Sequence, residues 1–266
     1  MKPVMNVLVA LACGAVIHAG LALAQTQPKV KSPKEADAIR AVQAATTADE
    51  RLKAIDNVLT KFADTEFKPL LLQMAMQLSQ QKNDYAQTTF YAEQLLEASP
   101  KNVFATVTLA GEIARHTREF DLDKEEKLAK AEKYANESIA NVAGIPKRAD
   151  LSDDQMNAMK KDLTAQAHEA LGMIASLRKK YDVAITEFSA SLSGSSAADP
   201  ATMVRLGQAY EDAHQFDEAT ATFDKAINAP NASPAVKQIA QGKKNEVAKM
   251  KAAAGGAASP APAPQP

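Results

Sequence analysis

Aromatic and strand-forming residues are scarce in this chain of 266 residues. It contains no tryptophan, and only 5% of its residues are aromatic. Clusters of β-branched residues are almost absent, whereas the helix formers Ala, Lys, Glu, Leu and Gln are abundant. Hydrophobic residues still make up 46% of the sequence. We therefore expect an all-α fold with a core of helices packed through small side chains.

Neither sign of charge dominates. The sequence has 31 Lys and Arg residues against 32 Asp and Glu residues, which gives a net charge of −1. A balance of this kind supplies no overall electrostatic attraction to nucleic acid or to an anionic membrane. We therefore expect no nucleic-acid partner.

The N-terminus has the pattern of a secretory signal peptide. Lys2 precedes an apolar run that ends in Ala22-Leu23-Ala24, and this order is typical of a segment removed during export. We predict a signal peptide over residues 1–24, cleavage after Ala24, and a location in the periplasm or cell envelope without stable membrane insertion. Retention as a membrane anchor and lipid attachment at Cys13 remain as alternatives.

Cys13 is the only cysteine, so the chain that remains after cleavage would contain none. Disulfides, thiolate catalysis and cysteine-ligated zinc would then be excluded. His116, His168 and His214 have no second ligand at metal-binding spacing, and no HExxH, P-loop or GxSxG pattern occurs. We predict no catalytic residues, no metal and no cofactor, and we expect a protein that is not an enzyme.

A repeated helical pattern is clearest over residues 200–233. Two helices are indicated there, separated by a break at residues 213–215. The spaced positions are Leu206, Gly207, Tyr210, Ala219, Phe223 and Ala226. This pattern resembles the tetratricopeptide repeat (TPR), a helix–turn–helix unit of 34 residues. Gly207 lets the two helices approach each other, while Tyr210 and Phe223 fill the space between them.

Weaker copies of the pattern extend the resemblance over most of residues 35–233. The third copy has an expanded turn at 117–126, and the capping box Ser152–Gln155 begins a long first helix in the fourth. The resemblance implies a right-handed α-solenoid of about five TPR-like repeats. A C-terminal capping helix is indicated over 233–253. We assign a flexible lead-in to 25–34, the repeat domain to 35–253, and a disordered Ala/Pro-rich tail to 254–266.

The resemblance also implies where a partner binds, because in TPR proteins the first helix of each repeat (helix A) lines a concave wall. The residues of this sequence that match the groove positions of TPR proteins would form a mainly apolar groove, which suits an amphipathic helix or an extended apolar peptide. The predicted groove residues are Leu72, Met76, Val107, Glu169, Met173, Val204 and Gln208. Internal packing of the same residues remains an alternative.

Together these observations favour a non-enzymatic scaffold of the cell envelope that binds a partner protein or peptide. Two alternatives stay open. One is a structural or self-assembling envelope module that forms a homo-oligomer, and the other is an accessory subunit of an envelope assembly or export complex.

Overall fold

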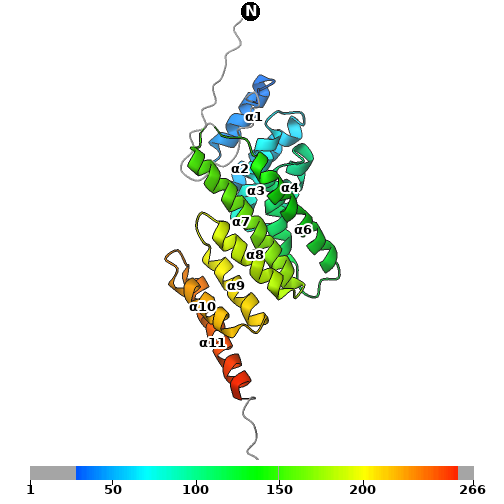
Figure 1. The fold of residues 1–266 in the computed structure, drawn as a ribbon. Coiled ribbons are helices and arrows are strands. Elements are labelled where there is room, and N and C mark those ends of the chain that lie inside the picture. Colours follow the sequence, from blue (N-terminus) through cyan, green and yellow to red (C-terminus); the bar gives the residue numbers. More distant parts are fainter. Residues whose placement is uncertain (1–27, 149, 257–266) are drawn as a thin grey trace, which may run out of the picture. The chain divides into compact units, whose positions relative to one another are not determined.

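The computed structural model describes residues 28–148 and 150–256, which are all-helical and contain no strand (Figure 1). The expected signal peptide, residues 25–27 of the lead-in and residues 257–266 of the tail lie outside the described residues. The described part contains eleven α-helices and one 3-10 turn, η1 (Val142–Gly144). The α-helices are α1 (Pro33–Ala44), α2 (Ala48–Lys61), α3 (Lys68–Gln81), α4 (Tyr85–Ala98), α5 (Val103–His116), α6 (Lys124–Asn141), α7 (Asp153–Leu177), α8 (Tyr181–Gly194), α9 (Pro200–Asp212), α10 (Phe216–Asn228) and α11 (Pro234–Gly256).

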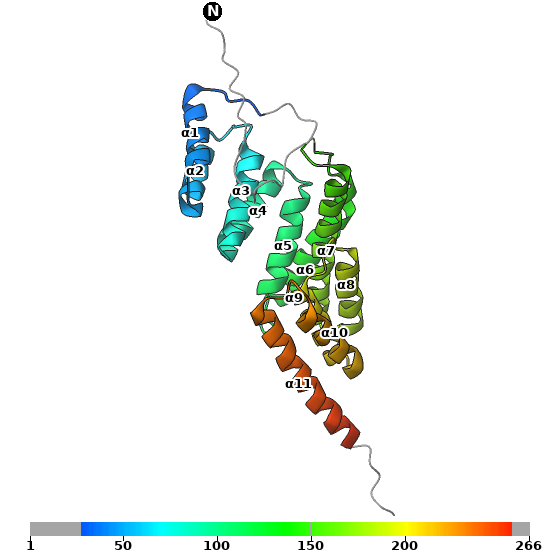
Figure 2. The same ribbon diagram turned by 90° about the vertical axis from the view of Figure 1, so that its left-hand side faces the viewer.

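The described residues fall into two compact units. Unit 1 comprises 28–100 and 146–148 and contains α1 to α4; unit 2 comprises 101–145 and 150–256 and contains α5 to α11. Inside each unit the helices pack as consecutive antiparallel pairs, such as α3 with α4 and α9 with α10 (Figure 2). This arrangement confirms the predicted all-α, TPR-like repeat fold.

Local sequence signals account for the helix ends. The Thr47 hydroxyl accepts a hydrogen bond from the Glu50 backbone N–H, and the Ser152 hydroxyl accepts one from the Gln155 backbone N–H. In return, the Glu50 and Gln155 side chains accept hydrogen bonds from the backbone N–H groups of Thr47 and Ser152. These reciprocal contacts satisfy N–H groups that a helix leaves unpaired at its first turn. The predicted capping box at Ser152 is thus present, and α7, which follows it, is 25 residues long.

Three of the turns within helix pairs share one backbone geometry. The turns at 82–84, 178–180 and 213–215 each place their middle residue in the left-handed region: Asn83 at φ 55°, Lys179 at φ 59° and His214 at φ 61°. This conformation at a helix C-terminus lets the following N–H groups reach the last free carbonyls. The α5–α6 connection is different, because it takes seven residues, 117–123, instead of three.

Helix α11 covers the last helix pair, as expected of a capping helix. Its buried residues Ala240 and Val247 form one apolar cluster with Phe223 and two alanines of α10. Lys244 of α11 also pairs with Asp224 of α10 at 2.6 Å. Ala240 and Val247 therefore face α10, whereas Ile239 and Met250 of the same helix are 55% and 48% exposed.

The described part of the expected flexible lead-in is held against unit 1. The Lys31 side chain donates to the Asp64 carbonyl at 2.5 Å and pairs with the Asp64 carboxylate at 2.8 Å. The Lys29 backbone N–H donates to Glu66 at 2.9 Å. Residues 28–32 are therefore non-helical but attached to the α2–α3 connection, which the sequence pattern did not indicate.

Candidate functional site

The structure separates the seven predicted groove residues into two groups. Four are buried: Leu72 and Met76 are 1% exposed, Val107 is 5% exposed and Met173 is 9% exposed. The other three, Glu169, Val204 and Gln208, are partly exposed on α7 and α9 of unit 2. The buried four do not line an accessible surface, so the packing alternative describes them better.

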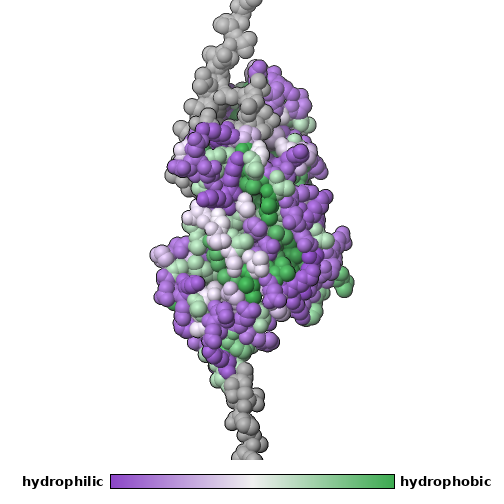
Figure 3. Space-filling model, viewed as in Figure 1, coloured by the Kyte–Doolittle hydropathy of each residue, from purple (hydrophilic) through white to green (hydrophobic). Residues whose placement is uncertain are grey.

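Contacts from several neighbouring helices explain this burial in unit 2. Helix α7 packs against α8, and also against both α5 and α6. A helix with neighbours on three sides keeps only a narrow accessible strip, so residues such as Met173 become core. Figure 3 shows hydrophilic residues over most of the face drawn, with hydrophobic residues in a smaller strip.

A cleft of about 330 Å³ lies beside the accessible part of the predicted groove, within unit 2. It is formed by α7, the end of α8, the α8–α9 loop and the start of α9. Its lining residues are Asp162, Ala165, Gln166, Glu169, Ser191, Leu192, Ser195, Ser196, Ala197, Asp199 and Thr202. Glu169 belongs to this lining, whereas Val204 and Gln208 lie further along α9.

The carboxylates of the cleft already have partners. Asp162 accepts hydrogen bonds from the Ser196 N–H and hydroxyl, both at 2.8 Å, and so holds the α8–α9 loop. Glu169 pairs with Arg205 at 2.7 Å, which joins α7 to α9. These acids fix the walls of the cleft, and the surface that they leave to a ligand is partly polar and partly apolar.

The histidines are placed apart and have structural neighbours. The His116 ring nitrogen lies 3.0 Å from the Glu112 carbonyl, the His168 ring nitrogen lies 2.7 Å from the Glu187 carboxylate, and His214 occupies the α9–α10 turn. Over residues 28–148 and 150–256, no three His, Cys, Asp or Glu side chains converge in a way that could hold a metal ion. The three histidines thus lie in different helix pairs of unit 2.

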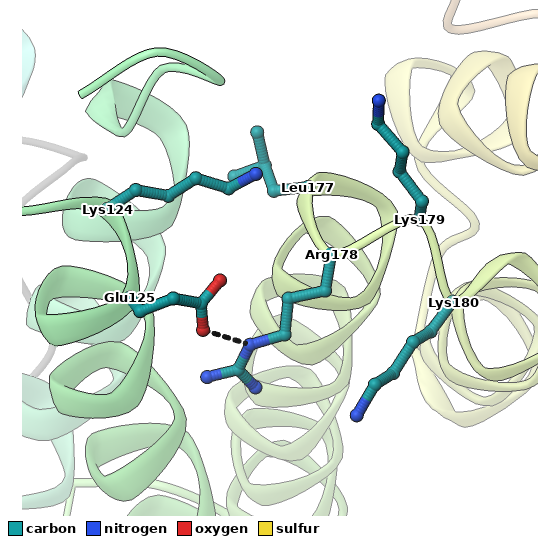
Figure 4. A pocket seen from close by; sticks show the side chains of 6 residues that line it. All are labelled: Lys124, Glu125, Leu177, Arg178, Lys179 and Lys180. Atoms are coloured by element: carbon teal, nitrogen blue, oxygen red, sulfur yellow. Dashed lines mark hydrogen bonds and ion pairs between the residues drawn. The ribbon is translucent and has the colours of Figure 1, made fainter. Parts of the chain in front are cut away.

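Sequence reasoning missed a second hollow in unit 2, between the start of α6 and the α7–α8 turn. It has a volume of about 490 Å³ and is lined by Lys124, Glu125, Leu177, Arg178, Lys179 and Lys180 (Figure 4). The Arg178 guanidinium donates to Glu132 at 2.7 Å and to Glu125 at 3.0 Å, and these bonds raise the pKa of Arg178. Arg178 thereby clamps the α7–α8 turn to α6.

The neighbouring α5–α6 connection carries two large apolar side chains in solvent. Phe120 is 90% exposed and Leu122 is 107% exposed. The expanded turn of the third repeat was visible in the sequence, and two apolar residues within it were the signal that could have identified this surface.

Comparisons with known proteins agree with the fold. No protein-family model matches the chain, and no curated protein sequence matches it significantly. The repeated helix pairs, their shared turns and their interlocking glycine–phenylalanine contacts define a TPR-like fold. A thermophilic TPR protein of Thermus thermophilus has a similar structure, with a TM-score of 0.52 and 15% identity over 79% of this chain and 98% of that chain.

None of the helices in the described ranges is both long and apolar enough to cross a bilayer.

Proposed function

We propose that this protein is a non-enzymatic scaffold that binds a partner protein or peptide through the α7–α9 surface of unit 2. The cleft beside Glu169 supports the proposal, because it combines a concave surface of mixed polarity with helix A residues that remain accessible. The TPR-like fold supports a protein partner, since stacked repeats present extended surfaces for binding other chains.

The accessible side chains define the chemistry of the partner. Gln166, Glu169, Arg205 and Gln208 are polar, whereas Val204 packs in part against the apolar cluster of α10 and α11. This composition suits an extended peptide with polar side chains better than an apolar helix, because Leu72, Met76, Val107 and Met173 are not available. Backbone and side-chain hydrogen bonds would fix such a peptide in the cleft.

Introducing positive charge at two glutamines tests this surface. Replacing Gln166 and Gln208 with arginine places two bulky cations on the binding surface. Gln208 also donates a hydrogen bond to the buried Glu211 carboxylate, so Gln166→Arg alone serves as the check on folding. We expect Gln166→Arg alone to keep the melting temperature of the unmodified protein, and capture of the native partner from envelope extract by the double variant to fall at least roughly tenfold. Gln87→Arg in unit 1 and Gln238→Arg on α11 are matched controls at exposed positions. Undiminished capture by the double variant would contradict the proposal.

We further propose that the scaffold acts in the periplasm or cell envelope after cleavage at Ala24. The support is the order of charged, apolar and small residues over 1–24. Mass spectrometry of the exported protein should give Gln25 as the first residue. A species that retains Cys13, with or without lipid, would refute this cleavage site.

The mass of the exported protein in solution, measured over a range of concentrations, separates a monomeric scaffold from a self-assembling module. A concentration-dependent homo-oligomer whose interface includes Gln166 or Gln208 would replace the scaffold proposal with the structural one.

A further inference from the structure

One buried side chain in the cleft beside Glu169 has no hydrogen-bond partner. Ser191, in the last turn of α8, is 6% exposed and lines the cleft. Its hydroxyl forms no hydrogen bond with any residue of 28–148 or 150–256. The hydroxyls of Ser138 and Ser176, in α6 and α7, instead bond to the carbonyl four residues earlier. A buried hydroxyl without a partner is unfavourable, so the Ser191 hydroxyl is a group that a ligand in the cleft can satisfy.

The ionisable residues that line the cleft are all acidic. They are Asp162, Glu169 and Asp199, and the lining contains no lysine, arginine or histidine. Arg205 pairs with Glu169 at 2.7 Å and compensates its charge. Asp162 and Asp199 form no ion pair with any described residue. Two carboxylates of the cleft therefore keep their negative charge uncompensated.

The two lysines that precede Asp162 on α7 lie outside this lining. Residues of the lining recur every three or four positions from Asp162 to Glu169, which is one side of the helix. Lys160 and Lys161 are not among them, and Lys160 donates to the Ala143 carbonyl at 2.9 Å. These lysines therefore do not supply the cation that the cleft lacks.

Neutral groups bond to the two carboxylates and leave their charge in place. Asp162 accepts a hydrogen bond from the Ser195 hydroxyl at 3.2 Å, and from the Ser196 N–H and hydroxyl at 2.8 Å. The Thr202 N–H and hydroxyl both donate to one oxygen of Asp199, Oδ2, at 3.0 Å. A carboxylate has about four acceptor sites, so the second oxygen of Asp199 is available to a ligand.

The helix ends at the cleft add to its negative potential. The last turn of α8 supplies Ser191 and Leu192 to the lining and contains no basic residue, so the partial negative charge of this C-terminus has no compensating side chain. The start of α9 has the opposite partial charge, but the Asp199 carboxylate already caps it. The cleft as a whole therefore attracts a cation.

We propose that the cleft binds a lysine side chain of the partner peptide. The ammonium group donates hydrogen bonds to Asp162, Ser191 and Asp199. The apolar lining residues contact the methylene groups of the lysine: Ala165, Leu192 and Ala197. This inference rests on the proposed function, because the lysine belongs to the peptide that the α7–α9 surface binds.

The mixed lining favours lysine over the other side chains. Lysine combines an apolar stem with a compact ammonium that carries three donors. An apolar side chain would leave the acids and the Ser191 hydroxyl without a partner. An arginine guanidinium is a planar fork that fits one carboxylate, whereas the acceptors here belong to three elements: α7, α8 and the cap of α9. The cleft, at about 330 Å³, is too small for a helix, which is about 10 Å across.

Peptides of defined sequence test this assignment. The probe is acetylated and amidated Gly-Ser-Lys-Ser-Gly, compared with forms that carry norleucine, arginine or glutamate in place of the lysine. The isotope-labelled exported protein is titrated with each peptide, and the Ser196 amide resonance is followed by NMR. This amide is a local reporter, because it donates to Asp162 at 2.8 Å.

We expect the lysine peptide to move the Ser196 resonance to a plateau in the millimolar range. The norleucine and glutamate peptides should bind at least roughly tenfold more weakly, because they lack the charged donor, and the arginine peptide should bind more weakly than the lysine peptide. Ser191→Ala should weaken binding of the lysine peptide roughly threefold at an unchanged melting temperature, since this hydroxyl has no partner in the chain.

Asp199→Asn removes a charge but keeps the helix cap, because asparagine caps helices as well as aspartate does. We expect this variant to bind the lysine peptide roughly tenfold more weakly without loss of stability. Asp84→Asn is the matched control, since Asp84 caps α4 of unit 1 by accepting from the Gln87 N–H at 3.0 Å. Its affinity for the lysine peptide should equal that of the unmodified protein.

An unmoved Ser196 resonance with the lysine peptide would overturn the proposal. An equal response to the norleucine peptide, or a tighter fit of the arginine or glutamate peptide, would also do so, because the cleft would then select a different side chain. Equal affinities of Asp199→Asn and Asp84→Asn would remove the assigned role of the carboxylate.

The peptide titrations use no native partner, so they can fail independently of the proposed function. If the lysine peptide does not bind while partner capture still falls in the Gln166→Arg and Gln208→Arg double variant, only the lysine assignment is lost. Undiminished capture by that double variant rejects the partner surface itself, whatever the peptides show.

Discussion

The Phe223 ring lies against Gly207 so closely that a Cβ on the glycine would be 2.6 Å from the ring. Gly172 and Phe188 make the same contact in the preceding helix pair, again at 2.6 Å. Phe223 and Phe188 are 0% and 1% exposed, so neither ring has free space to enter. The glycines therefore set the separation of α9 from α10 and of α7 from α8.

Gly207→Ala should destabilise unit 2 although alanine favours helices. The gain in helix propensity is about 1 kcal/mol, whereas overpacking a closed core costs about 1–3 kcal/mol. We expect a net loss, measured as a lower midpoint in urea unfolding. Gly111→Ala on α5 is the control, because its Cβ would meet only the Arg115 side chain at 3.6 Å, and this variant should be neutral or more stable. A Gly207→Ala protein as stable as the Gly111→Ala protein would contradict the packing argument.

His214→Gly should stabilise the α9–α10 turn. His214 has φ 61°, a conformation that costs about 1–2 kcal/mol for residues with a Cβ. Part of the gain is offset by loss of the edge contact between the His214 and Phe216 rings, whose centroids are 5.8 Å apart, so we expect a net gain of about 0.5–1 kcal/mol. Thermal unfolding measures this gain in stability.

Asn83→Gly, at the matching position of the α3–α4 turn, is the control. It should gain less stability, since asparagine tolerates this conformation. A larger gain for Asn83→Gly than for His214→Gly would argue against the explanation.

Glu211 should make stability depend on pH. It is 4% exposed, one of its carboxylate oxygens has no hydrogen-bond partner, and burial raises its pKa above the usual range, although nearby Lys243 opposes the shift. The folded state therefore holds this proton more tightly than the unfolded state. The stabilisation is complete below the unfolded pKa of about 4.3 and is lost as pH rises through the folded pKa.

Glu211→Gln removes this titration. Its stability relative to the unmodified protein should be lowest in acid and should rise as pH increases above about 4.3, measured by urea unfolding at a series of pH values. Glu246→Gln is a control of opposite sign, because the hydrogen bond from Lys243 lowers the pKa of Glu246. The stability of this variant relative to the unmodified protein should fall as pH rises from the folded pKa of Glu246 to its unfolded pKa of about 4.3. Parallel curves for the two variants would rule out the assignment to Glu211.

Glu35 should hold the chain segment that precedes α1. It is 1% exposed and accepts hydrogen bonds from the Lys31 N–H and the Thr65 hydroxyl, both at 2.6 Å. Glu35→Ala leaves these donors without their acceptor, and we expect a loss of about 1–3 kcal/mol from unit 1. Hydrogen exchange at the Lys31 amide should become faster in Glu35→Ala, and Glu35→Gln should preserve more protection because its side-chain oxygen still accepts. Equal exchange in all three proteins would show that the segment is held by other contacts.

Local signals in the sequence were sufficient to predict that the chain forms α-helices and where some of them begin. The spacing of apolar residues predicted the all-α fold, and Ser152 with Gln155 predicted the start of α7 correctly, because a capping box acts between residues three apart. The pairing of Gly207 with Phe223 also followed from the repeat pattern, since both belong to one helix–turn–helix unit. These features depend on residues that are close together in the chain.

Exposure, by contrast, was decided by tertiary structure. Met173 and Val204 have the same apolar character and both fitted the groove pattern, yet Met173 is 9% exposed and Val204 is only partly buried. Helix α7 packs extensively against α5, α6 and α8, whereas α9 packs extensively only against α8 and α10 and makes few contacts with α7 and α11. In the same way, Phe120 remained in solvent because the charged residues of its loop pair with Lys127 and Lys179. Periodicity identifies the side of a helix that is apolar, but the side that stays accessible depends on how extensively other helices pack against it.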